Sequence, residues 1–100
     1  MDKVILRTPG FIHDISEEKQ AEIMTIALKH INPKTTWVVF KKDAEQHYED
    51  EDRTLVIPMD IPEKVYAIQD DYHDPETLSQ EVGEKVNTRY TLTFLLADEY

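Results

Sequence analysis

The sequence contains no cysteine, and this absence excludes several kinds of chemistry. Without a thiol the chain has no disulfide, no cysteine nucleophile and no zinc site built from cysteines. Small secreted domains usually depend on disulfides for stability, so nothing in the composition argues for an oxidising compartment. We therefore predict a cytoplasmic protein.

Glycine is also scarce, with two residues, and the sequence has no Gly-rich phosphate loop, no HExxH motif and no nucleophile elbow. No stretch approaches the roughly 20 apolar residues that a membrane-spanning helix needs. The 21 acidic residues offer so many carboxylate pairs that choosing a catalytic acid and base would be arbitrary. We predict that the protein is not an enzyme, binds no cofactor and does not contact a membrane.

The residues that are present indicate one folded domain spanning residues 1–100. A chain of 100 residues has a single-domain length, and 40% of its residues are apolar. This apolar content is too high for an intrinsically disordered chain, although 32% of the residues are charged.

The negative charge is concentrated in the middle of the chain. Residues 43–76 hold twelve acids and two bases, so the net charge of this segment is −10, the same as the formal net charge of the whole sequence. A concentrated charge creates a directional field that attracts and holds cationic partners. Nucleic acid is a poor direct partner, because phosphate binding needs clustered lysine and arginine.

The apolar periodicity predicts four strands and two helices. We expect strands at residues 4–8, 35–42, 53–59 and 89–96, and helices at residues 17–31 and 75–86. Ser16 and Asp74 are the expected N-caps of the two helices. The first helix places its apolar stripe at Ala21, Ile23, Met24, Ala27, Leu28 and Ile31. Residues 63–73 fit a kinked strand extension, a short extra strand or an ordered loop.

The element order strand, helix, strand, strand, helix, strand is that of the split βαβ, or ferredoxin-like, arrangement. The predicted fold class is therefore α+β, with one antiparallel sheet and two helices on one face. In this arrangement the acids gather at two opposite ends of the sheet. The hairpin between the second and third strands carries Asp43, Glu45, Glu49, Asp50, Glu51 and Asp52, and the link into the second helix carries Asp60, Glu63, Asp70, Asp71 and Asp74.

The hairpin segment DAEQHYEDED, residues 43–52, is longer than the two to five residues that would close a hairpin. It is either a mobile loop or part of an extended ribbon, in which alternate acids lie about 7 Å apart. Such a ribbon would suit cationic side chains arrayed along a nucleic-acid channel. Tyr48, Tyr66 and Tyr72 are candidate aromatic anchors in or near the acidic segments, with partial core packing as the plain alternative for Tyr66. We expect Trp37 to lie in the core, and a simple solvated face is the plain alternative for the acids.

A metal site is a weaker hypothesis. The segments around His47 and His73 each combine one imidazole with carboxylates, which are ligands for divalent metals. Because the two segments are predicted at opposite ends of the sheet, we expect surface histidines and no metal.

By composition the chain resembles the small acidic inhibitors that phages and mobile elements encode, some of which imitate nucleic acid. The resemblance implies a viral inhibitor of the anti-restriction or anti-CRISPR type, whose partner is a basic protein such as a nucleic-acid-processing enzyme or complex. It extends to bacterial immunity proteins that neutralise basic toxins. A small metal- or ligand-binding enzyme on a ferredoxin-like scaffold is a third reading. No sequence feature indicates an oligomeric state.

Overall fold

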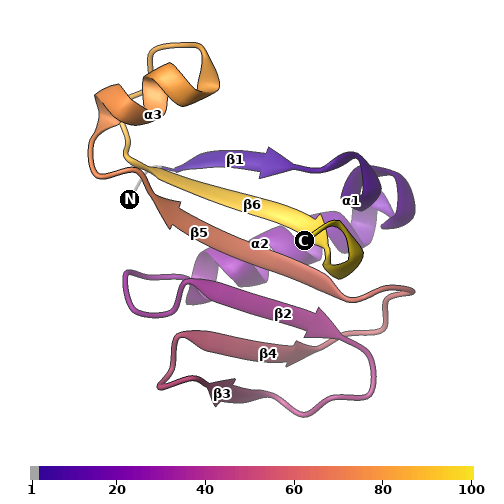
Figure 1. Ribbon diagram of the computed structural model, residues 1–100. Helices are drawn as coiled ribbons and strands as arrows, with labels where there is room; N and C mark the ends of the chain where they lie inside the picture. Colours follow the sequence, from indigo (N-terminus) through magenta and orange to yellow (C-terminus); the bar gives the residue numbers. More distant parts are fainter. Residues whose placement is uncertain (1–2) are drawn as a thin grey trace.

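The strands form one mixed sheet of six, in the order β1-β6-β5-β2-β4-β3 (Figure 1). The computed structural model describes residues 3–100. The strands are β1 (Val4–Arg7), β2 (Trp37–Lys41), β3 (His47–Glu49), β4 (Thr54–Pro58), β5 (Val65–Asp71) and β6 (Tyr90–Leu96). Two neighbouring pairs, β1 with β6 and β2 with β4, run parallel, and the remaining neighbours run antiparallel.

The predicted ferredoxin-like fold, with four antiparallel strands, is therefore wrong. Two strands lie in segments that the apolar pattern did not mark clearly. β5 is the extra strand among the alternatives for residues 63–73, and β3 lies inside the acidic decade, where charged residues hide the strand signal. The predicted ribbon of the strands at residues 35–42 and 53–59 does not form, because these strands are β2 and β4 and they run parallel. The antiparallel partner of β4 is β3 instead.

The helices are α1 (Pro9–Asp14), α2 (Glu17–His30) and α3 (Pro75–Val82), followed by the 3-10 helix η1 (Ala97–Glu99). Both predicted N-caps are confirmed: the Ser16 hydroxyl accepts from the Lys19 N–H at 3.2 Å, and the Asp74 carboxylate accepts from the Thr77 N–H at 2.7 Å. The sequence reading missed α1, although Thr8 caps it and Pro9 starts it. α3 ends before Gly83, which adopts φ 79° as its C-cap, so the predicted continuation to residue 86 is wrong.

The core lies between one face of the sheet and helices α1 and α2. Its fully buried side chains include Phe11, Ile23, Ala27, Val38, Phe40, Leu55, Val65, Ala67, Leu92 and Phe94. The predicted stripe of α2 is rotated, because Leu28 is 50% exposed and Gln20 is buried. Gln20 is satisfied there: its amide donates to the carbonyl oxygens of Ile12 at 3.0 Å and Ile15 at 2.7 Å, and its Oε1 accepts from Arg7 at 3.0 Å.

The opposite face of the sheet, called the open face here, is also largely apolar. Strand alternation places Trp37, Val39, Tyr66, Ile68, Thr93 and Leu95 on it. Helix η1 folds back in front of this face and brings Tyr100 close to it, while α2 lies behind the sheet (Figure 1). Among the described residues, no helix has the length and apolar character required to cross a membrane.

Candidate functional site

Four consecutive acids, Glu49 to Asp52, form an exposed turn between the edge strand β3 and β4. Asp50, Glu51 and Asp52 have φ values of 54°, 54° and 69°, in the left-handed region that L-residues adopt at a cost. The base of the turn is anchored to the start of β2, because the Thr35 hydroxyl donates to the Asp52 carbonyl oxygen at 2.7 Å. The backbone of the turn is therefore anchored to the segment that leads into β2.

A second group of acids lies where β5 ends and α3 begins. Asp70 and Asp71 are the last residues of β5, and Asp74 caps α3. The hydrogen bond from the Thr77 N–H holds the pKa of Asp74 below its ordinary value. Tyr72, predicted as an anchor, is half-buried between these acids.

The two groups lie at the same end of the sheet, which corrects the prediction that they lie at opposite ends. Relative to β2, β4 runs parallel and β5 runs antiparallel. The last residues of β5 and the first residues of β4 therefore lie at the same end of the sheet, on the left in Figure 1. Three strand spacings, roughly 14 Å, separate β5 from β3. We call this surface the acidic end; its residues are Glu49, Asp50, Glu51, Asp52, Asp70, Asp71 and Asp74.

Some of these acids are already paired. Asp52 lies 3.5 Å from the Lys34 ammonium, and Asp71 lies 3.2 Å from the Arg89 guanidinium. Asp50, Glu51 and Asp70 form no ion pair with any residue from 3 to 100. These three carboxylates are exposed and are the ones most available to a cationic partner.

Asp43 and Glu45, which were predicted to share a surface with the turn, lie elsewhere. They follow the end of β2, at the opposite end of the sheet from the β3–β4 turn. Lys42 and Asp60 form an ion pair of 3.4 Å near this second position. The acidic decade is therefore divided between the two ends of the sheet.

Tyr48 does not stand among the acids of the turn. It is paired with Leu55, whose side chain lies in the core on the helix-covered side, so Tyr48 points to that side of the sheet. Its neighbours His47 and Glu49 point to the open face. Tyr48 is 51% exposed because β3 is an edge strand. The predicted aromatic anchor and its neighbouring acids thus face different directions.

His47 is held between two acceptors on the open-face side of β3. Its Nδ1 lies 2.7 Å from the Glu45 carbonyl oxygen, and its Nε2 lies 2.7 Å from the Glu49 carboxylate. Both acceptors favour the doubly protonated imidazolium, and the hydrogen bond to Glu49 is the largest cause of the raised pKa of His47. Protonation of His47 therefore reduces the negative charge beside the turn.

We predict that His47 titrates above the ordinary histidine pKa of about 6.5. Because its folded pKa is raised, the stability that its protonated form contributes is fully present below the unfolded pKa and is lost as the pH rises through the folded pKa. An NMR titration of the imidazole protons measures this, and Glu49→Gln should lower the pKa. Glu51→Gln is the matched control, since Glu51 does not contact His47. A pKa that responds equally to both variants would contradict the assignment.

The sequence reading did not identify the aromatic cluster on the open face. Trp37, predicted as a core residue, is half-buried there and packs edge-on against Tyr66, with ring centroids 5.2 Å apart. Tyr100 completes the cluster at 5.0 Å from Trp37 and 6.0 Å from Tyr66. The apolar residues on both sides of β2 were the available signal, because they imply that this face is also partly covered.

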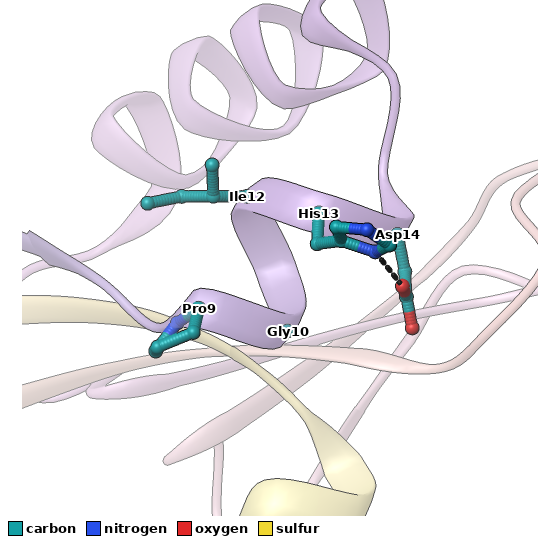
Figure 2. Close-up of a pocket in the computed structure, with 5 residues that line it drawn as sticks. All are labelled: Pro9, Gly10, Ile12, His13 and Asp14. Carbon is teal, nitrogen blue, oxygen red and sulfur yellow. Dashed lines mark hydrogen bonds and ion pairs between the residues drawn. The ribbon is translucent and has the colours of Figure 1, made fainter.

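A surface hollow of about 850 Å³ lies beside α1. Figure 2 shows that His13 is hydrogen-bonded to Asp14 there and that Ile12 points away from both. The hydrogen bond with His13 lowers the pKa of Asp14, while the hydrogen bond with Asp14 raises the pKa of Glu63. The His13 side chain is 89% exposed. A shallow hollow open to water does not provide the desolvation that acid–base catalysis uses to tune its groups.

No protein family, curated protein or solved structure matches the chain. The described residues contain no group of three histidine or acidic side chains arranged to hold a metal ion. His47 belongs to β3 and His73 to the link before α3, and both ring nitrogens of His47 are hydrogen-bonded, one to the Glu45 carbonyl oxygen and one to the Glu49 carboxylate. The acidic end is therefore the candidate functional surface.

Proposed function

We propose that this protein is a small acidic inhibitor, without enzymatic activity, that covers a basic nucleic-acid-binding surface of a partner protein. The observation that carries the proposal is that two acidic segments, residues 49–52 and 70–74, lie at the same end of the sheet. Clustered carboxylates there present a negative field to the lysine and arginine side chains that otherwise bind phosphates. The partner would be a nucleic-acid-processing enzyme or complex, which is the kind of target that viral anti-restriction and anti-CRISPR proteins inhibit. The two proteins would meet in the cytoplasm.

The backbone of the turn supports a role for its charges. Asp50, Glu51 and Asp52 occupy consecutive left-handed positions, which cost an ordinary L-residue such as glutamate roughly 1–2 kcal/mol and an aspartate less. Glycine would adopt the same conformation without that cost. Acids at these positions make the turn less stable than glycine would. A functional requirement for negative charge explains why acids are found there despite this cost.

The proposed mechanism is occlusion. The acidic end would replace the nucleic-acid backbone as the counter-charge of the partner's basic groove, and DNA or RNA could then bind only after the inhibitor had left. An immunity protein that neutralises a basic toxin would use the same attraction. The two functions differ in whether nucleic acid competes for the partner's occupied surface.

The test is capture followed by competition. Immobilised protein is exposed to a lysate from a bacterium that carries restriction or CRISPR enzymes, and retained proteins are eluted with duplex DNA or with a salt gradient. We expect a basic nucleic-acid-binding protein that DNA displaces and that elutes at moderate salt, because screening weakens charge-driven association. Retention that DNA does not disturb would favour a toxin partner, and retention equal to that of an uncharged control column would contradict the proposal.

A further inference from the structure

A hollow of about 340 Å³ opens on the open face next to the acidic end. Its aliphatic surface comes from Ile68 and Leu95, its aromatic walls are Trp37 and Tyr100, and Thr93 and the exposed Asp70 also line it. Small-molecule sites have volumes of roughly 300–1,000 Å³, so this hollow has room for a single side chain or a ligand of similar size. It joins an aromatic surface to a carboxylate.

Asp70 is the unpaired acid of its neighbourhood. Strand alternation turns Asp70 toward the open face and Asp71 toward the other side of the sheet. Asp71 is neutralised by Arg89 at 3.2 Å, whereas Asp70 forms no ion pair within residues 3–100. The mouth of the hollow therefore carries a negative charge that no described side chain balances.

The aromatic walls also favour a cation. The faces of Trp and Tyr rings attract ammonium and guanidinium groups within about 6 Å of the ring centroid. One member of the cluster already holds such a contact, since the Lys64 ammonium lies 5.7 Å from the centroid of Tyr66. Tyr100 is 76% exposed and so leaves much of its ring for another molecule.

We propose that this hollow binds the guanidinium group of an arginine side chain supplied by the basic partner. The arginine stem would pack on Ile68 and Leu95, its plane would stack on Trp37 or Tyr100, and its N–H groups would donate to Asp70. Arginine fits better than lysine because it is planar, weakly hydrated and able to donate two parallel hydrogen bonds to a carboxylate. This inference rests on the proposed function, for which it names the group that the partner contributes.

The experiment titrates the full chain with a hexa-arginine peptide and, separately, with a hexalysine peptide of equal charge. Trp37 is the only tryptophan, so its fluorescence reports on the hollow, and NMR shifts of the Thr93 and Asp70 amides locate the bound peptide. We expect hexa-arginine to bind at least about 5-fold more tightly than hexalysine, because stacking distinguishes the two cations.

Two variants and one control test the site itself. Asp70→Asn and Tyr100→Ala should each lower the affinity for hexa-arginine by about 5–10-fold, because each removes one contact of the guanidinium. Asp71→Asn removes an identical charge from the neighbouring position on the opposite side of the sheet, where Arg89 already pairs with it, and should lower the affinity by less than half as much as Asp70→Asn does. All three side chains are exposed, and unchanged circular dichroism spectra would show that the fold is kept.

Equal binding of the two peptides, together with equal effects of Asp70→Asn and Asp71→Asn, would overturn the arginine site and leave only general charge attraction. This result is separable from failure of the proposed function. If DNA displaces a captured partner but Asp70→Asn and Tyr100→Ala do not weaken its capture, the arginine site is wrong. If hexa-arginine binds in the hollow but no DNA-displaced partner is captured, the arginine site stands and the inhibitor function fails.

Discussion

Replacing Phe94 with alanine is expected to lower the free energy of unfolding by about 3–5 kcal/mol. Phe94 is fully buried in β6 and stacks on Phe11 of α1, with ring centroids 5.7 Å apart. The substitution removes the ring that holds α1 against the sheet and leaves a cavity in the core. Since domains of this size are stable by roughly 5–15 kcal/mol, a large share of the stability would be lost. Urea unfolding followed by circular dichroism measures the change.

Tyr48→Ala is the control for this substitution. It removes an aromatic ring of similar size from a side chain that is 51% exposed on an edge strand, so we expect a loss of less than about 1 kcal/mol. Equal losses for Phe94→Ala and Tyr48→Ala would mean that the core does not lie between β6 and α1.

Neutralising the turn, with Glu49→Gln, Asp50→Asn, Glu51→Gln and Asp52→Asn together, is expected to weaken binding of a captured basic partner by about 100-fold. The expectation follows from four exposed charges, each of which contributes a few-fold to a charge-driven association. The dependence of affinity on salt should also become shallower. Stability should be unchanged or slightly higher, because repulsion within the turn is relieved and asparagine tolerates the left-handed conformation. Isothermal titration at low and moderate salt provides both affinities.

The matched control neutralises four acids at the other end of the sheet: Asp43→Asn, Glu45→Gln, Asp60→Asn and Asp98→Asn. These side chains are exposed, and the substitutions change the net charge by the same amount. We expect this control to lose less than about 5-fold in affinity, through the long-range field alone. If both variants lose the same affinity and the same salt dependence, position does not matter and the acidic end is only part of a generally solvated surface.

Local signals in the sequence predicted much of the secondary structure. Ser16 and Asp74 marked helix starts because their side chains replace missing backbone acceptors in the first turn, an interaction within four residues. The segments that became β2 and β4 were recognisable as short continuous apolar runs, and the one that became β6 from its apolar alternation. These features depend on neighbours along the chain, so a sequence reading can find them.

The sheet topology and the position of the site depend on partners far apart in the sequence. β3 has only three residues, a histidine, a tyrosine and a glutamate, which give a weak strand signal. The tight turn that follows β3 decides its pairing with β4. Recognition of β5 as a strand reverses the expected position of residues 70–74 and brings them to the end that holds residues 49–52. The arginine-binding hollow needs β2, β5, β6 and Tyr100 together, and no local pattern encodes that combination.

The parallel pairing of β1 with β6 has a consequence for synthesis. Val4 lies opposite Thr91, so β1 is synthesised well before β6, the strand that hydrogen-bonds its inner edge. Phe11 likewise meets Phe94 only when β6 has emerged. During translation β1 and Phe11 therefore remain without these native partners until β6 emerges, and contacts of such long range make folding slow. Completion of β6 is the event that closes this end of the sheet and seats α1.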